Sequence, residues 1–185
     1  MIGDQKNVEV TGNVKWDAAV ALKPVNTVFK EKFKHRLGLE SGDFCWVSAS
    51  TREGEEKVLL SVYRRLLDKF KSVKLVLAPR HIERSGEVLE LSQSLGLRAR
   101  LWSKGDADVD VTVVDEFGLL GEFYELADAV FVGGTLVPHV GGHNFLEPAY
   151  LGKPIVIGQH VENFKDIARE FERAGALRSV SGGDQ

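Results

Sequence analysis

The chain has 185 residues, a length that suits one domain built around a single hydrophobic core. Apolar residues make up 43% of the sequence and charged residues 28%, a balance that excludes a disordered chain. The formal net charge is -3, and no basic stripe is interleaved with aromatic residues, so we expect no nucleic-acid partner.

Cysteine and membrane signals are sparse in the sequence. A single cysteine, Cys45, can form neither an internal disulfide nor a Cys-based zinc site, and its apolar neighbours predict a buried thiol. The polar first nine residues contain no signal peptide, and no apolar run approaches the ~20 residues that span a bilayer. We therefore expect a soluble chain without a membrane span, in a reducing, cytoplasmic setting.

Short apolar runs alternate along the chain with longer amphipathic segments. In chain order, the first half predicts strand Val8–Thr11, helix Thr27–Leu37, strand Phe44–Ala49, helix Val58–Phe70, strand Val73–Ala78 and helix Glu83–Leu95. The second half predicts strands Leu97–Trp102 and Val111–Val114, helix Leu119–Ala127, strand Ala129–Val132, helix Phe145–Leu151, strand Pro154–Ile157 and helix Asn163–Ala174. This alternation predicts an α/β fold, a doubly wound parallel sheet with helices on both faces.

Ligands of open parallel sheets bind beyond the carboxyl ends of the strands. The segments that follow the predicted strands are rich in small, polar and basic residues: Ser50–Arg52, Pro79–His81, Asp115–Phe117, Gly133–Thr135 and Gly158–His160. We expect any site to be built from them.

The segment Gly141-Gly142-His143-Asn144-Phe145-Leu146-Glu147-Pro148 has two interpretations. Its glycines permit close backbone approach, and the helix amides after them suit an anion. Asn144 and Glu147 share one helical face, where a carboxylate could accept both hydroxyls of a ribose. The same two residues also match a capping box at a helix start, and both roles can hold together.

Basic and hydroxyl residues offer similar alternatives. Arg80 suits a phosphate or carboxylate, or it pairs with the nearby Glu83. Ser50 and Thr51 read as a helix cap ahead of two acids, or as ligand contacts at the same edge of the sheet.

Two further clusters are read as non-functional. Four loop histidines, at positions 81, 139, 143 and 160, lack the spacing of a metal motif, so no metal is expected. The alternating Asp106, Asp108 and Asp110 are expected to form a solvated loop.

Six motifs, in this order and spacing, resemble the 3-deoxy-D-manno-octulosonic acid (Kdo) transferases. They are Thr11–Lys15, Ser50-Thr51-x-x-Gly54-Glu55-Glu56, Pro79-Arg80-His81-x-Glu83-Arg84, Phe131–Val137, Gly141–Pro148 and Glu162–Phe164. The match extends over most of this chain and about the second half of a family member.

The resemblance implies one Rossmann-like domain, residues 1–185, of a two-domain GT-B glycosyltransferase. It implies that the domain binds CMP-Kdo without a cofactor, in an enzyme that transfers Kdo to a lipid A precursor at the cytoplasmic side of the bacterial inner membrane. The acceptor site, the membrane anchor and the catalytic carboxylate would belong to an amino-terminal domain that this chain lacks, so we expect the chain alone to be inactive.

The resemblance also implies roles for individual residues. Asn144 and Glu147 would contact the nucleotide, whereas Arg80 and the backbone around the glycine pairs would face the phosphate and the Kdo carboxylate. The donor-binding residues expected are Ser50, Thr51, Arg80, Gly133, Gly134, Thr135, Gly141, Gly142, His143, Asn144 and Glu147.

The chain departs from the family at Arg52, where a histidine is common. Arginine keeps the positive potential and removes a possible proton-transfer group. Two alternatives remain: a similar domain for another nucleotide sugar, such as a UDP-sugar transferase or epimerase, and a nucleotide-binding module without a catalytic partner.

Overall fold

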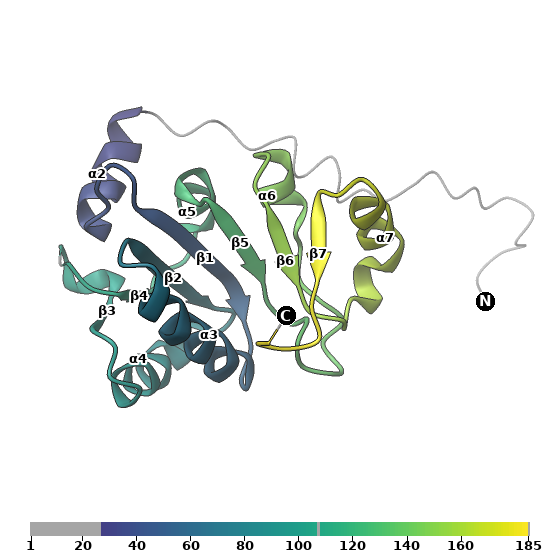
Figure 1. Cartoon of the computed structure of the whole chain (residues 1–185), viewed down its shortest axis with the longest axis horizontal. Coiled ribbons are helices and arrows are strands. Elements are labelled where there is room, and N and C mark those ends of the chain that lie inside the picture. The colour runs from purple at the N-terminus through teal and green to yellow at the C-terminus, as the bar shows by residue number, and fades with distance from the viewer. Residues whose placement is uncertain (1–26, 107, 185) are drawn as a thin grey trace, which may run out of the picture.

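The computed structural model describes residues 27–106 and 108–184, so the strand predicted at Val8–Thr11 lies outside it. In the described part, seven strands form one all-parallel sheet in the order β3-β4-β2-β1-β5-β6-β7 (Figure 1). They are β1 (Phe44–Thr51), β2 (Val73–Pro79), β3 (Ala99–Leu101), β4 (Val111–Val113), β5 (Ala129–Val132), β6 (Ile155–Ile157) and β7 (Leu177–Ser179).

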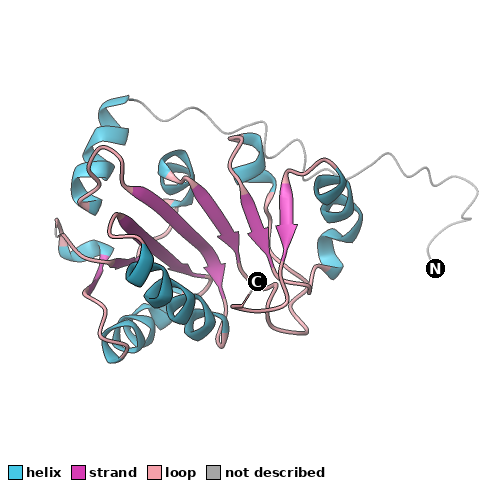
Figure 2. Ribbon diagram, in the orientation of Figure 1, coloured by secondary structure: helices cyan, strands magenta, loops and turns pink. Residues whose placement is uncertain are grey.

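Helices lie on both faces of this sheet, which confirms the predicted doubly wound α/β fold (Figure 2). The α-helices are α2 (Thr27–Leu37), α3 (Glu55–Lys69), α4 (Ser85–Ser94), α5 (Leu120–Leu126), α6 (Leu146–Tyr150) and α7 (Lys165–Arg173). Three short 3-10 turns, η2 (Ile82–Arg84), η3 (Trp102–Lys104) and η4 (Glu162–Phe164), connect them to the strands.

Two hydrophobic cores occupy the two faces. One packs α2, α5, α6 and α7 against the sheet around Val47, Val76 and Val130. The other packs α3 and α4 against Leu75, Leu77 and their neighbours. Cys45 belongs to the first core and is 1% exposed, and burial, followed by the charge of Asp128, raises the pKa of its thiol to about 12. The predicted buried thiol is thereby confirmed.

The sequence pattern does not predict β7, and it makes two elements of the other half of the sheet too long. Three residues, Leu177–Ser179, are too few for a period-two pattern, and what makes them a strand is their pairing with β6. The predicted helix Glu83–Leu95 is divided into η2 and α4, and the predicted strand Leu97–Trp102 shortens to β3 before η3. The hydrophobic pattern predicts that these segments exist. The residues at which they begin and end depend on the neighbouring segments with which they pair.

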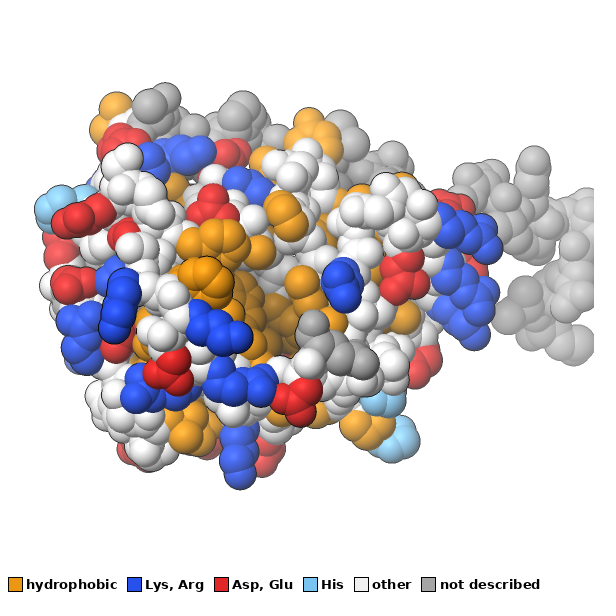
Figure 3. All heavy atoms as spheres, viewed as in Figure 1, with side chains coloured by type: hydrophobic (Ala, Val, Ile, Leu, Met, Phe, Trp, Pro, Cys, Tyr) orange, Lys and Arg blue, Asp and Glu red, His pale blue; other side chains and the backbone are white. Residues whose placement is uncertain are grey.

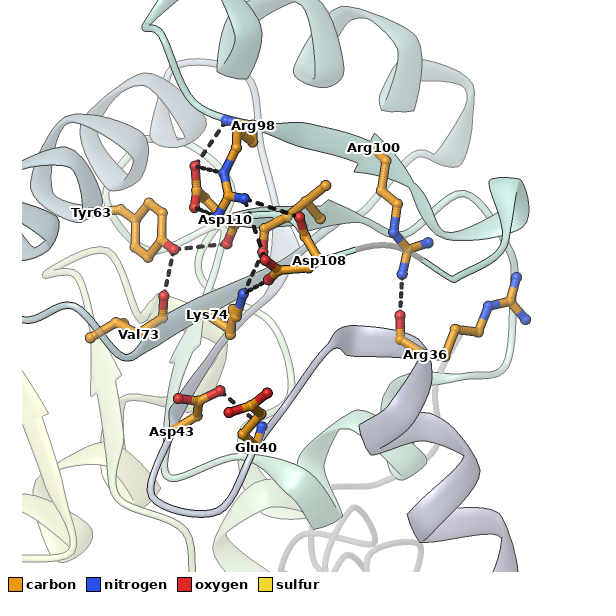
Figure 4. Close-up of polar contacts among 11 residues, drawn as sticks. Arg36, Glu40, Asp43, Tyr63, Val73, Lys74, Arg98, Arg100, Asp108 and Asp110 are labelled. Carbon is orange, nitrogen blue, oxygen red and sulfur yellow. Dashed lines mark hydrogen bonds and ion pairs between the residues drawn. The ribbon is translucent and has the colours of Figure 1, made fainter.

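Asp106 and Asp108 are exposed, as expected for a solvated loop, whereas Asp110 is half-buried, which corrects the interpretation for this residue. Asp110 forms an ion pair of 2.7 Å with Arg98, and Asp108 pairs with both Arg98 and Lys74 (Figure 4). Arg98 thus cross-links the segments before β3 and β4. These contacts lie where those strands begin, at the opposite end of the sheet from the predicted site.

The order of the strands reverses beside β1. The chain runs from β1 through β2 towards the β3 edge and then returns to place β5 on the other side of β1. At such a reversal the loops after the two neighbouring strands diverge, and a ligand crevice forms beyond their carboxyl ends. The fold therefore places the crevice between the segments that follow Ala49 and Val132.

Within residues 27–106 and 108–184, one part of the sheet is not covered by a helix. Apolar side chains, among them Trp46, Phe131 and Val156, line a groove of about 880 Å³ beside α3, and Lys69 and Arg178 lie at its rim. Figure 3 shows this hollow as a patch of apolar side chains bordered by basic ones. None of the helices in the described residues has the length and apolarity needed to cross a membrane.

The end of β6 makes a close backbone contact that can be tested. A Cβ added to Gly158 would lie 2.0 Å from the carbonyl oxygen of Thr135, a backbone atom that cannot swing aside. We expect Gly158→Ala to lower the free energy of unfolding by about 3 kcal/mol, the upper end of overpacking costs, in denaturant titrations. The control Gly86→Ala, with nothing within 4 Å of its Cβ, should be neutral or slightly stabilising. Equal effects of the two substitutions would contradict this packing.

Candidate functional site

The loop after β1 begins with a backbone irregularity. The register with β2 shifts between Ala49 and Thr51, and Ser50 between them has a φ of 54°, a left-handed conformation that is uncommon outside glycine. The hydroxyl of Thr51 points inward and donates to Glu56 Oε1 at 3.1 Å. The predicted hydroxyl cap of α3 is therefore wrong, because Gly54 precedes this helix and no side chain caps it.

The carboxylate of Glu55 joins the loops after β1 and β5. It is fully buried and accepts four backbone N–H groups at 2.8–2.9 Å, from Arg52, Gly134, Thr135 and Leu136. Glu55 is also the first residue of α3, where the helix dipole favours a negative charge. This carboxylate fills a ring of backbone amides of the kind that binds anions elsewhere.

The segment Gly133–Thr135 consequently differs from expectation. The amides of Gly134 and Thr135 donate to Glu55, and the amide of Gly133 donates to the carbonyl of Ala49. The hydroxyl of Thr135 donates to Val132 and accepts from Gly158. We expected this backbone to face a phosphate, but in the structure its donors hold neighbouring loops together.

The loop Gly141–His143 is bound to the same framework. Gly141 and Gly142 have φ values of 79° and 85°, as their predicted unusual dihedrals require. The amide of Gly142 donates to Gly134, and Asn163 donates to the carbonyls of Val140 and Gly142. Asn163 thereby connects η4 to the glycine loop.

Asn144 and Glu147 meet, but not as a capping box. Asn144 Oδ1 accepts the amide of Leu146 at 3.1 Å, and its Nδ2 donates to Glu147 Oε1 at 3.2 Å. A capping box would instead join each side chain to the other residue's backbone. Asn144 therefore occupies the amide of Leu146, the first amide of α6, which we expected to face an anion.

Three side chains converge where the loops after β1, β2 and β5 meet. Arg52 Nε donates to His143 Nε2 at 3.1 Å, and Arg52 NH1 lies 2.8 Å from His81 Nε2. The nearby Arg80 is exposed. Among the described residues neither arginine forms an ion pair, so the alternative pairing of Arg80 with Glu83 is not seen.

His143 is held neutral by this environment. Burial first, and then the charges of Arg52 and Arg80, lower the pKa of its imidazole to about 4 from an ordinary 6.5. The unfolded chain takes up this proton first as the pH falls, so the stability that His143 contributes is lost between pH 6.5 and 4.

The arrangement suits an anion more than a metal. In residues 27–106 and 108–184 no group of three or more His, Cys, Asp or Glu side chains is placed to hold a metal ion. Two guanidinium groups without carboxylate partners can instead bind a phosphate or carboxylate bidentately. Sequence reasoning identified Arg80 and included His81 in a segment expected to build the site, but it missed Glu55, although this residue lies inside a quoted motif.

Comparisons with known proteins show the family of this chain. No family model matches the chain. The 3-deoxy-D-manno-octulosonic acid transferase of Chlamydophila psittaci is 34% identical over 175 residues, which cover 94% of this chain and 39% of that protein. A bifunctional glycosyltransferase/methyltransferase of Fusobacterium nucleatum is also 34% identical, over 91% of this chain and 26% of that protein. The chain therefore spans well under half the length of these relatives.

A solved structure matches almost end to end. The C-terminal CMP-Kdo binding domain of WaaA from Acinetobacter baumannii has a TM-score of 0.77 and 30% identity, covering 85% of this chain and 84% of that one. Fold and match together define a Rossmann-like domain of the GT-B glycosyltransferases. The chain belongs to the Kdo transferase family, where it corresponds to the carboxy-terminal domain, and the resemblance drawn from its motifs is confirmed.

Replacing Glu55 tests what holds the site together. In Glu55→Gln one oxygen becomes an NH2 group, which leaves two of the four amides without an acceptor. Because hydrogen bonds to a charged group contribute about 1.5–3 kcal/mol each, we expect the free energy of unfolding to fall by at least about 2 kcal/mol. Denaturant titration measures this. The exposed Glu53 provides the control, since Glu53→Gln should change stability by less than about 0.5 kcal/mol.

Proposed function

We propose that this chain is the donor-binding domain of a Kdo transferase and that it binds CMP-Kdo at the carboxyl edge of β1 and β5. The observation that carries the proposal is the pair of arginines, Arg52 and Arg80, without ion-pair partners among the described residues, at the point where the strand order reverses. The name of the Acinetobacter domain, a CMP-Kdo binding domain, supports this ligand.

The donor carries two negative groups, a phosphate diester and the Kdo carboxylate. Arg80 and Arg52 are the cations at this edge, and Ser50 presents its backbone there in a left-handed conformation. Glu147 has one carboxylate oxygen bonded to Asn144, which leaves the other oxygen to accept ribose hydroxyls. We expect Gly141, Gly142 and His143 to lie between these two parts of the site.

The reaction that we propose for the complete enzyme needs a second domain. A hydroxyl of the lipid A precursor attacks the anomeric carbon of Kdo, and the bond from this carbon to the phosphate oxygen breaks. The hydroxyl proton passes to a general base outside this domain, and the electron pair leaves with CMP. Arg80 and Arg52 stabilise the phosphate charge that develops, which requires no metal ion. This transfer would take place at the cytoplasmic face of the bacterial inner membrane.

Calorimetric titration with CMP, UMP and AMP tests the proposal directly. We expect the chain to bind CMP selectively, with a dissociation constant on the order of 1 mM or tighter, which corresponds to at least about 4 kcal/mol. No Kdo transfer should follow when CMP-Kdo and lipid acceptor are added to the purified chain. Preference for UMP would favour a UDP-sugar donor, and no nucleotide binding would contradict the proposal.

Glu147→Gln separates a ribose contact from a structural one. Glutamine can still accept from Asn144 Nδ2, so stability should hold. Loss of a charged acceptor should weaken CMP binding by about 1–2 kcal/mol, measured by the same titration. Glu170→Gln, an exposed position on α7, is the matched control and should bind CMP normally. Unchanged affinity in Glu147→Gln would limit this residue to its bond with Asn144.

A further inference from the structure

Arg52 lies between two histidines that come from different loops. Its own backbone is held by Glu55, because the amide of Arg52 donates to Glu55 Oε2 at 2.8 Å. From there the guanidinium reaches His143, after β5, through Nε at 3.1 Å and His81, after β2, through NH1 at 2.8 Å. One side chain therefore spans three loops of the site before any ligand is bound.

A guanidinium can only donate hydrogen bonds. Both contacts reach the Nε2 atom of an imidazole, so each Nε2 must be an unprotonated acceptor. Each imidazole must then carry its single proton on Nδ1 and be neutral. The chemistry of arginine thus decides the tautomer of both His81 and His143.

The surroundings of the half-buried His143 oppose a second proton. Two guanidinium groups act on it, Arg52 from the loop after β1 and Arg80 from the loop after β2. The backbone of Gly134 packs against the ring, and a Cβ added there would lie 2.8 Å from it. In the part of the chain that the structure describes, no carboxylate is among the groups that shift the pKa of this imidazole.

We propose that Arg52 is a positioning residue that holds His81 and His143 as neutral Nδ1-protonated imidazoles, so that the site's positive charge comes from arginine alone. The consequence for the donor rests on the proposed function, but the tautomers do not. Arginine stays charged at any pH that a protein tolerates. The affinity of this chain for an anion should therefore not change as its histidines titrate. With a histidine at position 52 it would change.

Nuclear magnetic resonance of the imidazole nitrogens tests the tautomers without any nucleotide. At pH 7 we expect unprotonated Nε2 and protonated Nδ1 for both histidines, and titration should place the pKa of His143 near 4. In Arg52→Met both imidazoles lose their donor and His143 loses one neighbouring charge, so the pKa of His143 should rise, while burial still holds it below 6.5. Arg64→Met, an exposed position on α3, is the matched control and should leave both signals unchanged.

Several results would overturn the proposal. Protonated Nε2 in the wild-type chain contradicts it directly and needs no variant. Tautomers and pKa unaltered in Arg52→Met would show that burial alone determines them. If that variant does not fold, Arg52→Lys replaces it, because one ammonium at the end of a flexible stem cannot reproduce the fork and should release at least one imidazole.

The charge argument is tested by comparing wild type with Arg52→His across pH. The phosphate of CMP itself titrates near pH 6, and this contribution cancels in the ratio of the two dissociation constants. The imidazole in Arg52→His would lose its charge as the pH rises. The dissociation constant of this variant divided by that of the wild type should therefore grow about tenfold between pH 5.5 and 8, the difference between a charged and a neutral hydrogen bond. A ratio independent of pH would refute the role of Arg52. Absence of CMP binding in both proteins would instead count against the proposed function, and the tautomer measurement would still stand.

Discussion

The buried carboxylate of Glu55 is the contact on which the rest of the site depends. Charges are expensive to bury, and this one is compensated by four backbone amides from two loops. It fixes the amide of Arg52 on one side and the turn Gly134–Leu136 on the other. These loops follow β1 and β5, the two strands between which the order of the sheet reverses. The side chain of Glu55 therefore holds together the two loops that form the walls of the crevice.

The internal pairing of backbone donors has a consequence for ligand recognition. Glu55 occupies the amides after β5, and Asn144 occupies the first amide of α6. Backbone amides at helix starts and glycine turns commonly bind anions. In this chain most of these amides donate to side chains of the protein itself. The charge that remains for a phosphate or carboxylate lies on Arg52 and Arg80, whose side chains keep donors that no described carboxylate satisfies.

Much of the fold could be predicted from the sequence, because buried parallel strands contain continuous apolar runs, such as residues 75–79 of β2, and the helices between them are periodic. The segment Leu177–Ser179 could not, since pairing rather than pattern makes it a strand. The motif resemblance indicated which loops form the candidate site. Its interior contacts escaped prediction because Glu55 meets residues about 80 positions away, and a local pattern suggested only a helix start. The same limit hid the bridge from Arg52 to two histidines, whose partners only the folded sheet brings together.

A crystal of this chain soaked with CMP would show directly which groups hold the nucleotide. We expect a phosphate within hydrogen-bonding distance of Arg80 or Arg52 and ribose hydroxyls at the free oxygen of Glu147, with the Glu55 contacts unchanged. CMP bound in the apolar groove beside α3, or a phosphate distant from both arginines, would contradict it.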